Sequence, residues 1–250
     1  LQIQGPLSED LMAKMAGEEL RNVPYYGLME TNINGADCVI SQTGFTGEKG
    51  YEIYVRDTHE NAEKVWNQVL EDGEEFGLMV IAPAHHRRIA AGILSWGQDL
   101  DHESSPFQVN LSYQVPRNKE ADYIGKKELE RQRSIIDDGK EPFKMKMVGI
   151  TFGGKEITDY ASDFWLVSDT DGKDMGYVTS PWWSPELGTN IALAWVPWSS
   201  SEVGTKLFVK LPDEYSVNPG EPVEGVVADV PFRQSVNPNK REVEAAKGKD

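Results

Sequence analysis

The sequence predicts an α+β fold in two parts. The first part, residues 1–141, combines strand-like runs with stretches of helical periodicity. In the second part, residues 142–234, short β-like runs alternate with turns rich in Gly, Asp and Pro, which is typical of a small barrel or sandwich. Residues 235–250 are charged, and we expect a tail there. The chain therefore reads as an α+β domain followed by a small β domain.

The first part begins with a strand, a helix and a β-hairpin. Leu1-Gln-Ile-Gln-Gly-Pro6 predicts a short strand that ends at a Gly-Pro breaker. Residues 8–15 follow with apolar side chains at helical spacing, after a capping serine. Asn34-Gly35 lies between strand-like runs at residues 28–33 and 36–40, which is a strong hairpin signal.

One more strand and two more helices complete this part. Residues 51–55 are rich in β-branched and aromatic side chains and predict a strand. Residues 61–76 show helical periodicity, and residues 84–95 predict a second helix because Pro83 suits a first turn. The charged run at residues 130–141 indicates an exposed helix end and a linker, so we place the domain boundary near residue 141.

Six runs in the second part have strand character. They are residues 145–152, 164–168, 175–178, 191–196, 206–211 and 222–228. Pro181-Trp-Trp183 falls between two of these runs, so we expect the tryptophan pair in a loop. Two tryptophans in water are costly, and they would either pack across the domain interface or wall a substrate pocket.

The composition excludes several classes of function. A net charge of −16 and a pI near 4.7 argue against nucleic acid or anionic membranes as partners. No apolar run approaches the ~20 residues that span a bilayer. The single cysteine, Cys38, rules out an internal disulfide and fits a reducing compartment, so we expect the cytoplasm. Its apolar setting favours a small core residue over a nucleophile.

The sequence also lacks the motifs of other chemistries. His85 and His86 are adjacent and cannot share a helix face, and no His-x-x-x-His or Cys-x-x-Cys spacing occurs, so we predict no metal. There is no Gly-x-Ser-x-Gly elbow and no phosphate-binding Gly-x-x-x-x-Gly-Lys-Ser/Thr loop. The Gly44-x-x-Gly47-x-x-Gly50 pattern leads into a strand, unlike the dinucleotide fingerprint.

The stretch from Ser41 to Val55 is the candidate binding site. Its glycine-rich loop permits sharp turns or a close approach to a ligand. Along the following strand, Glu52 and Tyr54 share one face, because side chains alternate. An acid and a phenol on one face suit a flat ligand rich in N–H groups. The plainer alternative is a hairpin with a solvated polar face.

This stretch resembles the Gly-Tyr-Thr-Gly-Glu-Asp-Gly-Phe-Glu-Ile signature of the glycine-cleavage T-protein family, the tetrahydrofolate-dependent aminomethyl- and methyltransferases. The resemblance extends from Leu1 to Phe232. It implies a folate-binding α+β domain, a C-terminal β-barrel and tetrahydrofolate as cofactor. It also implies that Glu52 accepts two parallel hydrogen bonds from the pterin, a charge-assisted pair, and we expect Tyr54 to assist.

The resemblance further implies that part of the family fold precedes Leu1. In the family that part contributes an acidic catalytic residue, so we assign no catalytic residue in this chain. Residues 84–100 are similar to the family's Ala-Arg-Asp-x-Leu-Arg motif, and Arg88 and Asp99 match it. The family's first Arg falls on Ala84 and its acid on His85, which favours the branch of dimethylsulfoniopropionate demethylase.

We therefore expect a tetrahydrofolate-dependent methyltransferase that demethylates a small sulfonium-like methyl donor and gives 5-methyl-tetrahydrofolate. Tyr26 and Trp183 would be aromatic walls for the cation. One alternative is the aminomethyltransferase of glycine cleavage, whose partner would be a lipoyl carrier protein. Another is a non-catalytic folate-binding protein, but those relatives carry a Cys where this chain has Phe45.

Overall fold

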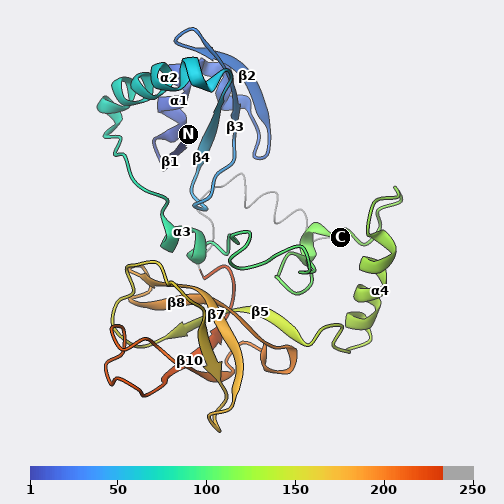
Figure 1. Cartoon of the computed structure of the whole chain (residues 1–250). Helices are drawn as coiled ribbons and strands as arrows, with labels where there is room; N and C mark the ends of the chain where they lie inside the picture. Colours follow the sequence, from blue (N-terminus) through green and yellow to red (C-terminus); the bar gives the residue numbers. More distant parts are fainter. Residues whose placement is uncertain (233–250) are drawn as a thin grey trace. The chain divides into compact units, whose positions relative to one another are not determined.

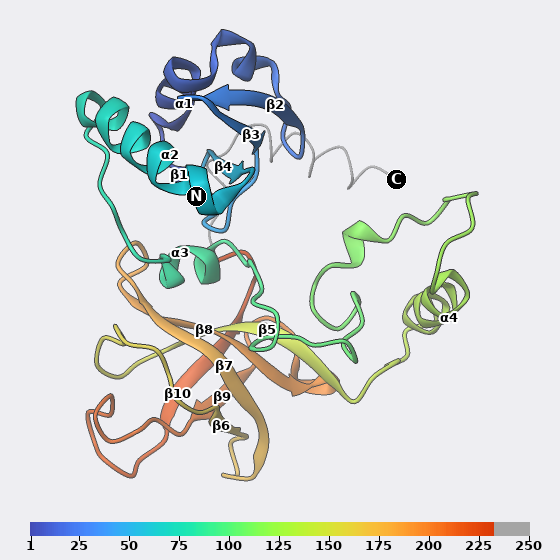
Figure 2. The ribbon, with the colours of Figure 1, turned by 45° about the horizontal axis from the view of Figure 1, so that its top comes forward.

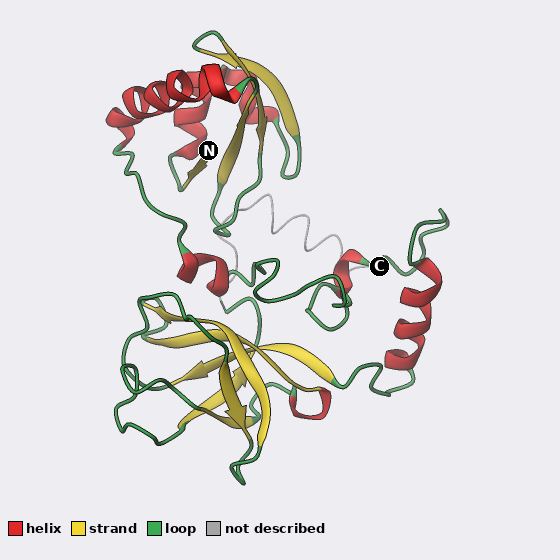
Figure 3. Ribbon diagram, in the orientation of Figure 1, coloured by secondary structure: helices red, strands yellow, loops and turns green. Residues whose placement is uncertain are grey.

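The computed structural model describes residues 1–232, so the charged tail expected over residues 235–250 lies outside the described part. The chain forms two compact units, Leu1–Ala84 and a second that begins at His85 (Figure 1). This division falls upstream of the boundary expected near residue 141, because the segment after Ala84 packs on the barrel. Each unit has its own sheet (Figure 3) and its own hydrophobic core.

The first unit contains a four-stranded antiparallel sheet in the order β1-β4-β3-β2. The strands are β1 (Gln2–Gln4), β2 (Leu28–Ile33), β3 (Ala36–Ser41) and β4 (Gly50–Val55). The predicted hairpin is confirmed, since β2 pairs with β3 and both Asn34 and Gly35 have positive φ. Positive φ at both central residues gives a turn whose twist matches that of the flanking strands.

Helices cover one face of this sheet (Figure 2). They are α1 (Ser8–Ala16), η1 (Glu18–Asn22), α2 (Thr58–Gly73) and η2 (Glu74–Phe76). The core between helices and sheet is mainly apolar, and it includes Leu11, Met12, Leu20, Ile33, Cys38, Ile40, Tyr51, Ile53, Val65 and Val69. The buried Tyr51 hydroxyl accepts from Gln42 Nε2 at 3.2 Å. Each such side chain contributes roughly 1.5–3 kcal/mol by leaving water. Cys38 lies in this core, as predicted.

The opposite face of the sheet is polar and partly exposed. The register places Gln2, Glu52, Ser41 and Leu28 in one row across the four strands. Tyr51 and Ile53 point into the core, so Glu52 and Tyr54 emerge on this opposite face. The predicted alternation along β4 is therefore confirmed.

The second unit begins with α3 (His85–Ala90), η3 (Ser112–Gln114) and α4 (Lys126–Asp137). The helix predicted over residues 84–95 is wrong in length, because α3 ends five residues earlier. Gly92 has a φ of 69° and donates to the Ile89 carbonyl, while Ile93 donates to the Arg88 carbonyl. These two bonds form a Schellman motif, which terminates a helix.

The rest of the unit is a closed six-stranded barrel in the order β10-β5-β8-β7-β6-β9 (Figure 2). Its strands are β5 (Met145–Phe152), β6 (Trp165–Ser168), β7 (Asp174–Ser184), β8 (Thr189–Pro197), β9 (Lys206–Val209) and β10 (Val223–Ala228), and η4 (Trp198–Ser200) follows β8. All six predicted strands are present. The tryptophan pair, expected in a loop, instead lies within β7, where Trp182 pairs with Ile191 and Trp183 with Asn190.

The barrel has an inner core and an outer apolar layer. The inner core includes Val148, Ile150, Val178, Ala192, Ala194 and Leu207. The outer layer joins Ile89 and Ala90 of α3 to Met147, Ile191, Leu193 and Trp195 of the barrel. Alternate residues of β5 and β8 serve the two layers, because successive side chains point to opposite faces. This packing explains why α3 belongs to the barrel unit.

Candidate functional site

Glu52 lies on the polar face of the first unit with its carboxylate held by three donors. Gln2 Nε2 donates to Oε1 at 3.0 Å, and the Tyr54 hydroxyl donates to Oε2 at 3.1 Å. Thr43 Oγ1 also donates to Oε2. An ionised carboxylate offers about four lone-pair sites, so these three bonds fix its orientation and leave one site on Oε1. A ligand that bonds both oxygens would replace Thr43 or Tyr54 on Oε2.

Tyr54 is suited to remain a donor. Its side chain is 55% exposed on the same face. Desolvation, and after it the charge of Glu52, raises the pKa of the Tyr54 hydroxyl above its usual value. The phenol is therefore protonated at neutral pH, and it keeps donating to Glu52.

A cavity of about 560 Å³ runs along the edge strand β1. Gln2 and Gln4 line one side of it, and Trp66 of α2 and residues 78–84 line the other. Much of the lining is apolar, including Phe45 and the extended Met79-Val80-Ile81 segment. Glu52 does not line the cavity, but its partner Gln2 does, so the carboxylate is one hydrogen bond away from the cavity wall.

Tyr26 lies at the same end of the sheet as Glu52. Its backbone N–H donates to the carbonyl of Gln42 at 3.2 Å, and Gln42 directly precedes Thr43, which bonds Glu52. The Tyr26 side chain is 59% exposed, and its ring centroid is 4.1 Å from that of Tyr25. A left-handed φ of 64° turns the chain at this position.

Trp183 belongs to the second unit, whereas Glu52, Tyr54 and Tyr26 belong to the first. Its backbone N–H donates to the Ile157 carbonyl at 2.8 Å. The neighbouring Trp182 makes the ring contacts, with centroids 5.1 Å from His85 and 5.3 Å from Tyr160. The substrate-binding role expected for Trp183 remains a prediction.

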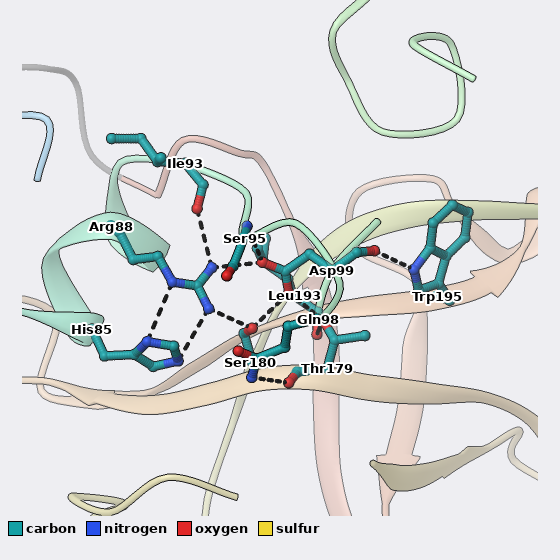
Figure 4. Close-up of polar contacts among 10 residues, drawn as sticks. All are labelled: His85, Arg88, Ile93, Ser95, Gln98, Asp99, Thr179, Ser180, Leu193 and Trp195. Atoms are coloured by element: carbon teal, nitrogen blue, oxygen red, sulfur yellow. Dashed lines mark hydrogen bonds and ion pairs between the residues drawn. The ribbon is translucent and has the colours of Figure 1, made fainter. Parts of the chain in front are cut away.

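Arg88 forms the centre of a buried polar network in the second unit (Figure 4). Its side chain is 1% exposed, and Nη1 lies 2.6 Å from Asp99 Oδ2. The same guanidinium donates to the Ile93 carbonyl at 3.1 Å and to Ser180 Oγ at 2.7 Å. The His85 ring lies alongside, with Nδ1 3.3 Å from Arg88 Nε. This network ties α3 and the turn after it to β7.

Asp99 accepts hydrogen bonds from several segments of the chain through its carboxylate and its backbone carbonyl. Its Oδ1 takes the hydroxyls of Thr179 and Ser180, each at 2.6 Å, and its Oδ2 takes the Ser95 N–H at 2.8 Å. The Asp99 carbonyl accepts from Trp195 Nε1 at 2.8 Å. A buried carboxylate is stable only when it is paired and hydrogen-bonded in this way.

Burial determines the charge state of His85. Desolvation, together with the nearby positive charge of Arg88, lowers the pKa of His85 to about 4. The imidazole is therefore neutral at physiological pH and can accept from the guanidinium. Desolvation also lowers the pKa of Arg88, and Asp99 opposes that effect. His85 is thus a partner of Arg88 and not an exposed acid or base.

Within residues 1–232, no group of three or more His, Cys, Asp or Glu side chains is arranged to hold a metal ion. Over the same residues, every helix is too short or too polar to cross a bilayer.

Sequence reasoning did not find the partners that organise these sites. Arg88 and Asp99 match a motif, but their bonds to Thr179 and Ser180 span 80 to 92 positions of sequence. Gln2, which holds Glu52 across 50 residues, had no local signal either. Only the pairing of β1 with β4 brings these two side chains together.

The fold defines a class of two-domain proteins in which an α+β domain precedes a closed β-barrel. Models of known protein families match both domains. The GCVT N-terminal domain model matches residues 1–119, and the glycine cleavage T-protein C-terminal barrel domain model matches residues 146–229. Together they cover most of the chain. The chain belongs to the glycine cleavage T-protein family.

Individual relatives agree with this assignment. The chain is 34% identical over 197 residues to an aminomethyltransferase of Geobacillus sp. (strain WCH70), covering 78% of this chain and 51% of that protein. It is 32% identical over 235 residues to an aminomethyltransferase of Thermotoga neapolitana, covering 92% of this chain and 57% of that protein. The chain thus spans about half the length of the curated relatives it matches.

A solved structure shows the same fold. The glycine cleavage system aminomethyltransferase T from Bartonella henselae matches with a TM-score of 0.73 and 23% identity. The match covers 94% of this chain and 59% of that one.

Proposed function

We propose that this protein is a tetrahydrofolate-dependent one-carbon transferase, and that Glu52 holds the pterin. The observation that carries the proposal is the Glu52 carboxylate, fixed by Gln2, Thr43 and Tyr54 on the polar face of the sheet. Membership of the T-protein family and the aminomethyltransferase names of the relatives support it.

The residues present fit a reduced pterin. The amino-pyrimidine edge of a pterin presents adjacent N–H donors, and a carboxylate accepts two of them as a charge-assisted pair. Tyr54 and Gln2 donate to the same carboxylate, so they orient it before the ligand arrives. Tetrahydrofolate would supply the nucleophilic nitrogen that takes up the one-carbon group. The task of this chain is then to hold and orient that cofactor.

Aminomethyl transfer is the first candidate reaction. The relatives at 30–34% identity are named aminomethyltransferases. In this reaction a lipoyl carrier protein would deliver the aminomethyl group, and ammonia would be released.

The single cysteine is buried at position 38, which suits a reducing compartment such as the cytoplasm.

Demethylation of a small methylated compound, such as a sulfonium, is the second candidate. It is favoured by Ala84 and His85, which replace an Arg and an acid of the family motif. His85 is neutral and contacts Arg88, so it does not replace the missing acid. Such a reaction needs alignment and exclusion of water more than acid–base help, and Tyr26 offers an exposed ring to a cationic donor.

The test of cofactor binding is Glu52→Gln, measured by calorimetry with tetrahydrofolate. Losing a charge-assisted pair weakens binding by about 1.5–3 kcal/mol, or roughly 10- to 150-fold. Glu30→Gln is the matched control, because Glu30 is an acid on β2 of the same sheet and pairs with Arg56. Unchanged affinity in Glu52→Gln would refute the proposed role.

A second assay separates the two reactions. The protein is incubated with tetrahydrofolate and either aminomethylated lipoyl carrier protein or dimethylsulfoniopropionate. Methylene-tetrahydrofolate with ammonia identifies aminomethyl transfer, and 5-methyl-tetrahydrofolate identifies demethylation. Neither product from either donor would overturn the proposed transferase activity.

A further inference from the structure

A second cavity, of about 320 Å³, lies in the barrel unit and includes none of the residues proposed to bind folate. Residues 97–108 form one side of it, and β7 and β8 contribute to the other. Its volume is within the roughly 300–1,000 Å³ of small-molecule sites.

Three aromatic rings line this cavity. Phe164, just before β6, is 52% exposed and stacks on Tyr177 of β7, with centroids 5.3 Å apart and planes at 19°. Trp195 of β8 is 8% exposed, and its Nε1 is tied to the Asp99 carbonyl (Figure 4). That bond fixes the indole in place. The faces of such rings carry the negative part of the aromatic quadrupole.

Every charged side chain that lines this cavity is acidic. Asp101 and Glu103 line the cavity and are exposed, and no Lys, Arg or His is among the described residues that line it. Asp101 Oδ1 accepts from the Glu103 N–H at 2.9 Å, which places the two acids together. Asp101 and Tyr177 line the same cavity, and burial, and after it the charge of Asp101, raises the pKa of Tyr177. The Asp99 carboxylate is neutralised by Arg88 and faces away from Trp195.

We propose that this cavity binds a small methylated ammonium ion. Ring faces attract such a cation without needing hydrogen bonds from it, and the carboxylates of Asp101 and Glu103 add attraction at the rim. A neutral ligand of the same shape would gain neither the cation–π attraction of the rings nor the charge attraction of the two carboxylates. The site is independent of the proposed transfer reaction, because it shares no residue with the pterin site.

Choline and its neutral carbon isostere 3,3-dimethyl-1-butanol test the proposal. In calorimetric titrations of the 250-residue chain, we expect choline to bind about tenfold more tightly, as cation–π contacts predict. Equal affinities, or no heat from choline, would overturn the proposal.

Variants locate the site. Phe164→Leu keeps an apolar side chain but removes the ring, and it weakens choline binding about fivefold. The double variant Asp101→Asn with Glu103→Gln weakens it by a similar factor and removes its salt dependence. The controls Phe45→Leu and Glu202→Gln, which change a ring and an acid outside the cavity, bind as the wild type does.

Two further results separate this site from the pterin site. Glu52→Gln leaves choline affinity unchanged, so failure of folate binding and failure of choline binding are independent outcomes. Circular dichroism confirms that Phe164→Leu is folded. A folded Phe164→Leu variant with wild-type choline affinity would show that the ring does not form the site.

Discussion

Replacing Asp99 with Asn should destabilise the barrel unit severely. The Asp99 carboxylate accepts from Arg88, Thr179 and Ser180 inside the protein, at 2.6 Å in each case. An amide of the same shape carries no charge, and in any orientation it offers one acceptor oxygen where the carboxylate offers two. The Arg88 guanidinium would remain buried without its counter-charge. Breaking a buried ion pair in this way costs about 3–5 kcal/mol.

Urea and thermal unfolding measure this cost. For a chain of this size, the expected loss corresponds to a fall in Tm of about 6–20 °C. Asp137→Asn is the matched control, because Asp137 pairs with Arg117 at 2.8 Å on the surface. Exposed pairs contribute about 0–1 kcal/mol. If Asp99→Asn cost no more than Asp137→Asn, the buried network would contribute no more to the stability of the barrel unit than an exposed ion pair does.

Three further predictions concern the helix end, the histidine and the tyrosine. Gly92→Ala should cost about 1–3 kcal/mol in urea unfolding, because φ is 69° and a Cβ would lie 2.6 Å from Val230; a change below 0.5 kcal/mol, roughly the size of a surface substitution, would contradict this. His85 has a native pKa of about 4, below its unfolded value near 6.5, so stability is full above pH 6.5 and falls by about 2–3 kcal/mol as the pH drops to 4. His85→Gln should remove this pH dependence when the free energy of unfolding is measured between pH 4 and 7. An unchanged pH dependence would show that His85 is not its source. Tyr54→Phe removes one donor to Glu52 and should weaken tetrahydrofolate binding about two- to tenfold in calorimetry, whereas wild-type affinity would mean that the phenol does not orient the carboxylate.

Local sequence patterns predicted most of the fold. Asn34-Gly35 specified the hairpin because only a few residues tolerate positive φ at both central positions. The alternation of Tyr51, Glu52 and Ile53 placed the acid on the polar face, since period-2 side chains leave no other arrangement once two of them are buried. The barrel strands were also predictable from local sequence, because their runs of β-branched residues are bounded by turn residues.

The remaining features depend on long-range contacts. The helix beginning at His85 ends at the Schellman motif around Gly92, and a side chain there would meet Val230, which is 138 positions later in the sequence. The pairing of β7 with β8 extends through Trp182, although that segment looked like a loop. The partners of Arg88 come from three separate segments, and no periodicity reports them.

The packing of β4 links the position of Glu52 to the folding of the first unit. Had the strand slipped by a single position against its neighbours, Glu52 would be driven into hydrocarbon while Tyr51 emerged into water. Such a shifted conformer would lose the core packing of Tyr51 and the exposed position of Glu52 at the same time. Substitutions at Gln2, Thr43 or Tyr54 would change how the carboxylate is oriented, whereas a change of register would remove it from the polar face.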